Sequence, residues 1–447
     1  MRKFALIGHP LGHSLSPEIH AAIMEEAGLR GTYALLDIAP EDLPARMPEL
    51  LRAYDGFNAT IPHKKAVIPL LSGLSEAAKR CGAVNTVCGG RGYNTDTVGF
   101  RSAGMPLEGA RVVLLGTGGV SSMMAAESIA AGAATIVVAS RERATGESFV
   151  AGLRAAFPGS RCALSAVASE EEKNAAVAEA TVLLNGSPVG MWPNAGGIPV
   201  DPAALHPGLS VFDPVYCPTP SRLVLNARKA GARAVGGLAM LVHQAVEAQK
   251  IWNPGLSLDA AAIAEKILPR LAADLWRKNP VKIVLTGFMG AGKSTVGRLL
   301  SHSLGIGFSD LDAAIAAAAG RSIPEIFAER GEPGFRALET EVARKVLSEG
   351  ASEVVASGGG FPIEEANRAL VRASNALVIH VEGDFETLWA RISASGGRPL
   401  GTERAAAAAR YAARAPVYRA FCDAVSETTA TGSPASVASA IAALLRA

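Results

Sequence analysis

The sequence predicts an α/β protein of about three lobes, with mainly parallel sheets. Three observations predict this fold class. Segments typical of strands and of helices alternate along the chain, as they do in β-α-β units. Two glycine-rich loops, near residues 116 and 287, each follow an apolar strand-like segment and precede a helical one. The length of 447 residues is more than one ordinary domain holds.

Composition and charge argue against several classes of partner. The 43 Lys and Arg residues nearly balance the 41 Asp and Glu residues, whereas proteins that bind nucleic acid or membrane surfaces usually have a basic excess. No apolar run reaches the roughly 18 residues of a transmembrane helix, and the apolar stretch at 4–8 is too short for a signal peptide. The five scattered cysteines predict reduced thiols in a cytoplasmic protein. We therefore expect small-molecule partners, with no nucleic acid and no membrane.

The first hundred residues predict strands at 4–8, 33–38 and 56–61 and helices at 16–28 and 41–54. Ser16 is expected to be the N-cap of the first helix, with Pro17 at its first helical position. Polar residues gather at strand ends and in loops, where α/β proteins build sites; they are Ser14, Ser16, Asn58, Thr60, Lys64, Asn85, Thr86 and Asp96. Each alone also suits a structural role, such as a helix cap, a turn or a solvated lysine. Together, their hydroxyl, amide, ammonium and carboxylate groups predict a site.

A second unit starts near residue 104. A strand at 111–115 leads into the loop Gly116-Thr117-Gly118-Gly119-Val120-Ser121, and a helix at 122–132 and a strand at 135–139 follow. The G-x-G-x-x-S spacing is a dinucleotide-binding fingerprint in which Ser121 replaces the third glycine. The first two glycines permit the turn and the close approach of the pyrophosphate, which rests on the helix N-terminus.

The end of the second strand bears on the choice between NAD and NADP. A carboxylate at this place binds the ribose 2′-hydroxyl of NAD, whereas the chain reads Ser140-Arg141-Glu142-Arg143. The hydroxyl of Ser140 and the guanidinium groups of Arg141 and Arg143 suit a 2′-phosphate, so NADP is the expected cofactor. Glu142 keeps NAD open as the alternative, because it could bind the ribose instead.

The later strand–helix alternation sets the expected domain limits. Strands are expected at 181–185, 211–214 and 232–235, and helices from 236 to about 252 and at 259–277. The second helix ends at Asn279-Pro280, which marks a boundary. We expect one domain at 1–103 that is completed by 236–272, a dinucleotide-binding domain at 104–235, a linker at 273–280 and a P-loop domain at 281–447.

The P-loop domain is expected from the pattern G-x-x-x-x-G-K-[ST]. The matching residues are Gly287, Phe288, Met289, Gly290, Ala291, Gly292, Lys293 and Ser294, and Thr295 follows. A strand at 281–285 and a helix at 295–304 flank the loop, as the motif requires. Backbone N–H groups of such a loop point at the phosphates of a nucleotide. Lys293 adds a positive charge, and Ser294 is the expected ligand of Mg²⁺.

Further candidate groups follow the P-loop. Asp310 and Asp312 end a strand one residue apart, so both carboxylates are expected to face one site. Arg336 and Glu339 lie one helical turn apart, where a surface ion pair is the alternative interpretation. A glycine triplet at 358–360 lets a ligand approach the backbone closely. The C-terminal part adds Arg391, Arg398 and Arg414, and the glycine-rich segment at Arg398 suits a lid that closes over phosphate.

Two families are recognisable in these motifs. Residues 1 to about 272 resemble shikimate dehydrogenase, through Ser14-Leu15-Ser16-Pro17, 57–64 (FNATIPHK), 82–86 (GAVNT), Asn94-Thr95-Asp96 and 237–244 (GLAMLVHQ). Residues from about 281 to the end resemble shikimate kinase, through the P-loop, Asp310-Leu311-Asp312, Phe335-Arg336-x-x-Glu339, the glycine triplet and Arg398-Pro399-Leu400. The first resemblance implies a two-lobed dehydrogenase, made of an α/β substrate domain and a Rossmann NADP domain. The second implies a P-loop kinase domain of the α/β/α type.

The dehydrogenase resemblance implies a role for most of the N-terminal candidates. Lys64 and Asp96 form the catalytic pair, with Lys65 as an alternative to Lys64. Ser14 and Ser16 hold the substrate carboxylate. The other substrate-binding residues are Asn58, Thr60, Asn85, Tyr216 and Gln244, and the NADP(H)-binding residues are Gly116, Thr117, Gly118, Gly119, Val120, Ser140, Arg141, Arg143 and Gly237.

The kinase resemblance implies that ATP and Mg²⁺ bind at the P-loop. Shikimate would contact Asp312, Arg336, Glu339, Gly358, Gly359, Gly360 and Arg414. Lys293 and the lid residue Arg398 would offset charge on the transferred phosphoryl group, and Asp312 would orient or deprotonate the attacking hydroxyl. Mg²⁺ would be held by Ser294 and, through water, by Asp310, and Arg391 would lie beside adenine.

The favoured hypothesis is a bifunctional enzyme, a monomer or a homodimer, that reduces 3-dehydroshikimate with NADPH and then phosphorylates shikimate with ATP. A second hypothesis keeps the dehydrogenase but gives it quinate as substrate or NAD as cofactor. A third treats the C-terminal half as a nucleotide-binding regulatory module without catalysis.

Overall fold

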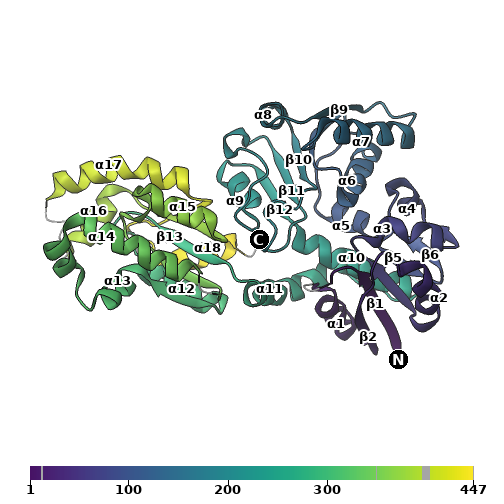
Figure 1. The fold of residues 1–447 in the computed structure, drawn as a ribbon, viewed down its shortest axis with the longest axis horizontal. Helices are drawn as coiled ribbons and strands as arrows, with labels where there is room; N and C mark the ends of the chain where they lie inside the picture. The colour runs from purple at the N-terminus through teal and green to yellow at the C-terminus, as the bar shows by residue number, and fades with distance from the viewer. Residues whose placement is uncertain (12–13, 349, 395–402, 446–447) are drawn as a thin grey trace. The chain divides into compact units, whose positions relative to one another are not determined.

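The computed structural model describes residues 1–11, 14–348, 350–394 and 403–445. It contains three β-sheets with helices packed on them, so the predicted α/β fold class is confirmed (Figure 1). The described chain divides into two compact units. The first contains Met1–Pro188, Pro199–Tyr216 and Gly231–Ala272, and the second contains Val189–Ile198, Cys217–Ala230 and the chain from Ala273 onward.

The first sheet belongs to the N-terminal part of the first unit and has the strand order β2-β1-β3-β5-β6-β4. Its strands are β1 (Arg2–Gly8), β2 (Gly31–Asp37), β3 (Gly56–Ala59), β4 (Gly73–Leu74), β5 (Thr86–Cys88) and β6 (Arg91–Tyr93). The strand β1 is parallel to β2 and β3, whereas β5 is antiparallel to both β3 and β6. The helical segments are α1 (Ser16–Glu26), α2 (Leu43–Ala53), α3 (His63–Ala66), η1 (Ile68–Leu70), α4 (Glu76–Cys81) and α5 (Asp96–Ser102).

The start of α1 corrects one expectation. Leu15, rather than Ser16, occupies the N-cap, and Ser16 is the first helical residue. The serine hydroxyl that bonds the backbone here is that of Ser14, which accepts a hydrogen bond from the Ser16 N–H at 3.2 Å. The reason is that Leu15 already has helical dihedral angles, so the helix starts one residue earlier than its serine suggests.

The second sheet is wholly parallel and has the order β12-β11-β10-β7-β8-β9. Its strands are β7 (Arg111–Leu115), β8 (Thr135–Ala139), β9 (Ala163–Val167), β10 (Val182–Asn185), β11 (Ser210–Asp213) and β12 (Arg233–Gly236). The helical segments are α6 (Gly119–Ala130), α7 (Arg143–Ala156), α8 (Glu170–Glu179), η2 (Pro202–Ala204) and α10 (Gly237–Trp252). The strand order reverses between β7 and β10, which is where doubly wound sheets bind ligands.

Trp252, at the end of α10, anchors that helix to the first sheet. Its ring is 1% exposed and stacks on Phe4 with ring centroids 4.7 Å apart, and its indole N–H donates to the Val87 carbonyl at 3.0 Å. Gly56 leaves the space for this ring, because a Cβ there would lie 2.2 Å from two atoms of the indole. The chain therefore returns to the N-terminal sheet after it has completed the second sheet.

The third sheet is also parallel, with the order β14-β15-β13-β16-β17. Its strands are β13 (Lys282–Thr286), β14 (Gly307–Asp310), β15 (Glu353–Ala356), β16 (Ala376–Glu382) and β17 (Ala424–Glu427). The helical segments are α12 (Lys293–Leu304), α13 (Leu311–Ala319), α14 (Ile323–Ser348), η3 (Phe361–Ile363), α15 (Glu365–Ala373), α16 (Phe385–Ala394), α17 (Arg404–Phe421) and α18 (Pro434–Leu444). The preceding helix, α11 (Ala260–Lys278), has residues in both units, which divide after Ala272. Gly331 interrupts α14 with φ of 64° and ψ of −176°, so two helices meet there.

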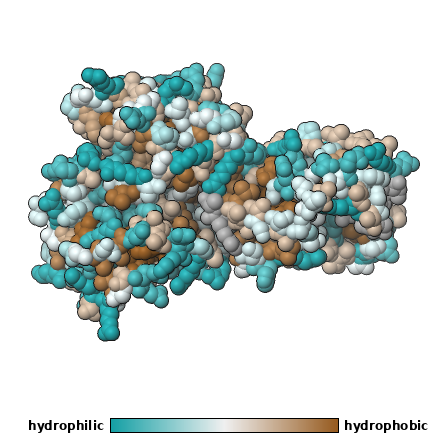
Figure 2. All heavy atoms as spheres, turned by 180° about the vertical axis from the view of Figure 1, so that it is seen from behind, coloured by the Kyte–Doolittle hydropathy of each residue, from teal (hydrophilic) through white to brown (hydrophobic). Residues whose placement is uncertain are grey.

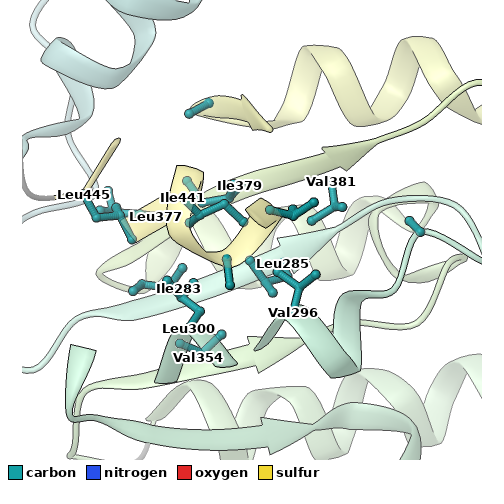
Figure 3. Packing of buried hydrophobic residues seen from close by; sticks show 14 of the residues in the cluster. Ile283, Leu285, Val296, Leu300, Val354, Leu377, Ile379, Val381, Ile441 and Leu445 are labelled. Carbon is teal, nitrogen blue, oxygen red and sulfur yellow. The ribbon is translucent and has the colours of Figure 1, made fainter. Parts of the chain in front are cut away.

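Alternating residues of β13 reach the two faces of this sheet. Ile283 and Leu285 pack with residues of α12 and α18, such as Leu300 and Ile441, as Figure 3 shows. Val284 lies in a separate cluster with residues of α13 and α14. Because successive side chains of a strand point to opposite faces, a continuous apolar strand is buried from both sides.

Two segments that precede residue 231 in the sequence belong to the second unit. They are Val189–Ile198 and Cys217–Ala230, and the latter contains α9 (Arg222–Lys229). The Arg222 side chain pairs with Asp423 at 3.0 Å, and both groups are largely buried. Both segments lie inside the range 104–235, which the sequence assigns to the dinucleotide-binding domain. The compact units of the structure therefore do not coincide with the domain limits expected from the sequence.

Polar and hydrophobic residues are mixed on the surface. Figure 2 shows hydrophilic residues spread among hydrophobic ones over the face that it draws. Among the described residues, no helix is both long enough and apolar enough to cross a membrane. All five cysteines lie in the described ranges and are free thiols.

We predict that Gly56→Ala destabilises the first unit by about 1–3 kcal/mol, because the added methyl group overpacks the Trp252 ring. Calorimetry of the whole chain should show a lower transition temperature for the first unit and an unchanged transition for the second. Gly73→Ala is the matched control, since a Cβ there would project into open space among the described residues. Equal shifts for both variants would contradict this account.

Candidate active sites

The first candidate site is centred on an ion pair between Lys64 and Asp96. Lys64 lies on the short helix α3 after β3, and Asp96 is the first residue of α5. The Lys64 ammonium donates to Asp96 Oδ2 at 2.7 Å, and the two side chains are only 19% and 12% exposed. Asp96 Oδ1 accepts a second hydrogen bond, at 2.9 Å, from the amide of Asn85. This pair therefore places an ammonium group, a proton donor, at a partly exposed position with a fixed carboxylate beside it.

Buried amides and hydroxyls surround this pair. The Asn85 amide group donates to Thr95 Oγ1 at 3.0 Å and to Gln244 Oε1 at 3.4 Å, and its carbonyl oxygen accepts from the Thr95 N–H at 2.7 Å. Asn58 donates to the Asn85 backbone carbonyl at 3.0 Å and to the Thr86 hydroxyl at 2.9 Å. The structure thus joins Asn58, Asn85, Asp96 and Gln244, which are far apart in sequence, in one network.

Tyr33 extends this network to the serines before α1. Its hydroxyl donates to Asn58 Oδ1 at 2.8 Å. Burial raises the pKa of Tyr33, and a hydrogen bond with Ser16 acts in the opposite direction. Ser14 and Ser16 also bond each other through their hydroxyls at 3.1 Å. Tyr33 was not predicted as a site residue, because a tyrosine inside a strand gives no local signal of a polar contact.

Two other expected substrate-binding residues lie at strand ends. Thr60 follows β3, and its methyl group lies over Gly8, where a Cβ would come within 2.6 Å of it. The backbone N–H of Thr60 donates to the Ile7 carbonyl at 2.9 Å. Tyr216 is partly exposed and lies three residues after the end of β11.

The glycine loop after β7 leaves the first N–H groups of α6 without a side-chain cap, so they are available to a phosphate. Gly116 has φ of 87°, and a Cβ there would lie 3.2 Å from the backbone of Gly186. The helix α6 begins at Gly119, earlier than expected, and its N-cap Gly118 has no side chain to bond the first N–H groups. Thr117 and Val120 are partly exposed beside them. These N–H groups and the positive end of the helix dipole suit a pyrophosphate.

The residues that follow β8, at 140–143, differ in the contacts that their side chains make. Arg143 makes two hydrogen bonds to the Glu172 carboxylate, at 2.6 and 2.8 Å. Backbone N–H groups of Ala168 and Ser169, and then Arg143, lower the pKa of Glu172 to about 2. Arg141 is exposed, and Ser140 donates to the Glu142 carbonyl at 2.7 Å. Of the two arginines expected at the 2′-phosphate, Arg143 is thus already paired with a carboxylate.

Gly237 opens α10 at the end of β12. A Cβ at this position would lie 2.0 Å from the Pro214 carbonyl oxygen, so only glycine fits against this backbone. The residue before it, Gly236, is the N-cap of the helix. The loop after β11 and the start of α10 are therefore held in close contact.

The second candidate site is a cavity of about 210 Å³ at the P-loop. The loop glycines Gly287, Gly290 and Gly292 have φ of 148°, 80° and 82°, conformations that favour glycine. Lys293 is the first residue of α12, and its ammonium donates to the carbonyls of Gly287 at 2.8 Å and Phe288 at 3.1 Å. The candidate residues that line this cavity are Gly290, Gly292, Lys293, Ser294, Thr295, Asp310, Asp312, Gly358, Gly359 and Arg391.

Asp310 and Asp312 both line the cavity, but the strand argument for them is wrong. Asp310 ends β14 and is the N-cap of α13, and its carboxylate accepts from the Asp312 and Ala313 N–H groups at 3.1 and 3.3 Å. Asp312 lies in the first turn of that helix. The two carboxylates meet because the strand turns into a helix between them. Among the described residues, no group of three or more His, Cys, Asp or Glu side chains could hold a metal ion.

The glycine triplet lies close to three of the other candidates. A Cβ at Gly358 would lie 3.0 Å from both Asp312 Oδ1 and Glu339 Oε1, and one at Gly360 would lie 2.3 Å from Arg336 Nη2. Arg336 donates to Glu339 at 2.8 Å, and Glu339 is 1% exposed. Burial raises the pKa of Glu339, whereas Arg336 opposes this shift. The Arg336–Glu339 pair is thus buried against the triplet, unlike the surface pair that was the alternative.

The helix α17 contacts the triplet from the other side. Arg414 donates to the Gly359 carbonyl at 3.2 Å, and the hydroxyl of the buried Tyr418 donates to the same oxygen. Arg391 donates to Thr428 Oγ1 at 2.9 Å and to the Thr429 carbonyl at 2.7 Å. Arg398 lies outside the described residues. The sequence analysis missed Tyr418, since its contact partner lies 59 residues away.

Comparisons with known proteins identify a kinase domain in the C-terminal part of the chain and a dehydrogenase domain in the N-terminal part. The family model described as shikimate kinase matches residues 289–446, and that of the shikimate dehydrogenase substrate binding domain matches residues 6–87. The NADP-dependent shikimate dehydrogenase of Moorella thermoacetica is 38% identical over 263 residues, which cover 56% of this chain and 87% of the relative.

Two solved structures are similar to the first part of the chain. The shikimate 5-dehydrogenase of Thermus thermophilus, in complex with NADP(H) and shikimate, has 34% identity and a TM-score of 0.53, and the match covers 61% of this chain and 100% of that one. The enzyme of Listeria monocytogenes, in complex with shikimate and NAD, has 27% identity and a TM-score of 0.54, with 60% and 96% covered.

The buried His20 beneath the first site gives a pH prediction. It stacks on Tyr33 with ring centroids 4.2 Å apart, and Gln249 donates to its Nδ1 at 3.0 Å. Burial lowers its pKa from 6.5 to about 3. Between these values the unfolded chain takes up a proton that the folded chain does not. The stability of the first unit therefore falls as the pH drops through this window, by at most about 1.4 kcal/mol per pH unit for this group.

Calorimetry from pH 7 to pH 5 measures this effect. The variant His20→Gln, which is neutral in both states, should show a smaller fall in the first transition temperature than the parent chain. An identical pH dependence in the two proteins would contradict the buried neutral imidazole.

Proposed function

The chain belongs to the shikimate dehydrogenase family and carries a shikimate kinase domain, and we propose that it catalyses two successive reactions. The first is the NADPH-dependent reduction of 3-dehydroshikimate to shikimate. The second is the ATP- and Mg²⁺-dependent phosphorylation of shikimate to shikimate 3-phosphate. The observation that carries this proposal is that one chain has both the Lys64–Asp96 pair and a P-loop cavity lined by Asp312. The product of the first reaction is the acceptor in the second.

In the reduction, Lys64 acts as the general acid. When NADPH is bound, it supplies the hydride that reduces the C3 carbonyl of the substrate. Negative charge then builds on the carbonyl oxygen, and the Lys64 ammonium stabilises this charge and donates a proton to it. Asp96, held by Asn85 on its other oxygen, fixes the position of the ammonium.

We assign the remaining polar groups of this site to substrate and cofactor. Ser14 and Ser16 bind the substrate carboxylate, and its hydroxyl groups bind Asn58, Thr60, Asn85, Asp96, Tyr216 and Gln244. NADP(H) lies on the loop Gly116–Val120 and against Gly237. Ser140 and Arg141 bind its 2′-phosphate, and Arg143 contributes less because Glu172 holds it. The NAD alternative rests on Glu142 and on the Listeria monocytogenes enzyme, which was solved with NAD.

In the phosphorylation, Asp312 orients or deprotonates the shikimate hydroxyl that attacks ATP. Arg336, which Glu339 holds in place, and Arg414 bind the shikimate carboxylate, and the triplet Gly358–Gly360 allows the ring to approach the backbone. Lys293 and Arg398 offset the charge on the transferred phosphoryl group. Bound Mg²⁺ neutralises phosphate charge, and Ser294 and, through water, Asp310 would hold it. Arg391 would lie beside adenine.

We also propose the wider organisation of the protein. The substrate domain comprises 1–103 with 236–272, the Rossmann domain 104–235, the linker 273–280 and the kinase domain 281–447. The protein acts in the cytoplasm as a monomer or a homodimer.

The direct test is a coupled assay of the whole chain. We expect 3-dehydroshikimate, NADPH, ATP and Mg²⁺ together to yield shikimate 3-phosphate, with shikimate alone accumulating when ATP is left out. ATP binding without ADP release that depends on shikimate would instead support a regulatory C-terminal module. Turnover with quinate or NAD tests the second hypothesis.

We predict that single substitutions separate the two activities. Lys64→Ala should lower the kcat of reduction by about 10²–10⁴-fold, because the proton donor is lost, and should leave phosphorylation unchanged. Lys293→Ala should abolish phosphorylation and leave reduction unchanged. Each variant is thus the control for the other, and loss of both activities in a folded single variant would contradict the assignment.

We predict that Arg141→Ala lowers kcat/KM for NADPH by about 10- to 100-fold, which is the effect of losing one charge-assisted contact to phosphate. The value for NADH should change little, because NADH lacks the 2′-phosphate. Arg143→Ala is the comparison variant, and its effect should be smaller because Glu172 already holds this arginine. A larger effect of Arg143→Ala would reverse the assignment.

A further inference from the structure

A buried carboxylate lies between the two lobes of the first unit. Glu127 is the ninth residue of α6, the helix that starts at the cofactor loop, and it is only 3% exposed. Its Oε2 accepts from Arg101 Nε at 2.5 Å, and its Oε1 lies 3.6 Å from Arg80 Nη2. None of these residues belongs to the motifs of the dehydrogenase resemblance.

The two arginines come from helices that carry the substrate site. Arg101 lies on α5, whose first residue is Asp96, so little more than one helical turn separates the arginine from the proposed catalytic carboxylate. Arg80 lies near the end of α4, five residues before Asn85, which bonds Asp96. A shift of α5 along α6 would therefore move Asp96, and with it Lys64.

Packing beside this cluster is incomplete. A cavity of about 310 Å³ lies between the ends of α5 and α6, and Glu127, Arg101 and the apolar side chains of Phe100 and Met105 line it. Deeper in the unit, Phe100 contacts Phe212 edge-on with ring centroids 5.2 Å apart. On the cavity side, the Glu127–Arg101 ion pair joins the two helices.

Buried ion pairs seldom add net stability, because desolvation of both charges offsets their attraction. Their attested contribution is to specify one arrangement over others. The contacts of Glu127 fit such a contribution, since they connect three helices at one point.

We propose that Glu127 is a positioning residue for the reduction. Its ion pairs with Arg101 and Arg80 set the position of α5, and thereby of the Lys64–Asp96 pair, relative to the cofactor-binding helix α6. This proposal rests on the reduction proposed above. A displaced acid and a displaced hydride acceptor slow the chemical step, because a misplacement of about 1 Å can cost up to 10²-fold in rate.

The test compares Glu127→Gln and Arg101→Ala with the parent chain. We expect the kcat of dehydroshikimate reduction to fall by about tenfold or more, with KM values for both substrates changed less than about threefold. The primary isotope effect with NADPH deuterated at the transferred position should rise, because hydride transfer becomes more rate-limiting. Glu127→Asp, which keeps the charge, should restore part of kcat.

Two controls separate this role from a loss of folding. The calorimetric transition of the first unit reports its folding, and phosphorylation by the same chain reports the amount of active protein and should stay constant. Lys79→Ala removes the exposed Lys79–Glu76 pair from the same helix as Arg80 and should leave kcat and the isotope effect unchanged. If Glu127→Gln folds poorly, the double variant Glu127→Leu with Arg101→Met removes both charges together and should still be slow.

An unchanged kcat and isotope effect in folded Glu127→Gln and Arg101→Ala, with only a lower transition temperature, would overturn the proposal. A parent chain that fails to reduce dehydroshikimate would instead refute the proposed function, so the two failures are distinguishable.

Discussion

The structure depends on how its helices begin. A helix start has N–H groups without partners in the helix, and these must be bonded by a side chain or left for a ligand. At α4, α8, α9 and α18 a serine at the N-cap bonds them. At α6, α10 and α12 the N-cap is a glycine, and within the described part of the chain no side chain caps these helices. Other helices, such as α2 and α7, also lack a side-chain cap. The helices at the proposed nucleotide sites differ from these because their N-cap is glycine, so no N-cap side chain lies beside the N–H groups that would bind phosphate.

The two units have related α/β folds but perform different chemistry. Each unit uses the carboxyl ends of parallel strands, and each places one lysine next to its site. Lys64 bonds a carboxylate, so its ammonium is held where a proton is needed. Lys293 donates to the carbonyls of Gly287 and Phe288, which holds its ammonium over the loop where phosphate charge is expected.

Local signals in the sequence predicted much of this arrangement. The strands at 111–115 and 135–139 match β7 and β8, because apolar runs bounded by glycine or polar residues have clear ends. The P-loop was expected from its motif, and its glycines Gly287, Gly290 and Gly292 have positive φ. What the sequence could not reveal depends on partners far along the chain. Glu172 engages Arg143 across 29 residues, and Tyr33 bonds Asn58 across 25. The approach of Asp310 and Asp312 was expected for a wrong reason, since a helix, not a strand, follows Asp310.

The replacement of the third fingerprint glycine by Ser121 has a consequence for how such motifs evolve. Ser121 is fully buried, and its hydroxyl donates to the Gly186 carbonyl at 3.4 Å. A Cβ at Gly186 would lie 2.0 Å from that hydroxyl. The Ser121 side chain thus occupies space that a side chain at position 186, 65 residues later, would need. In this chain the glycine requirement belongs jointly to the loops after β7 and β10, and either position can acquire a side chain only while the other lacks one.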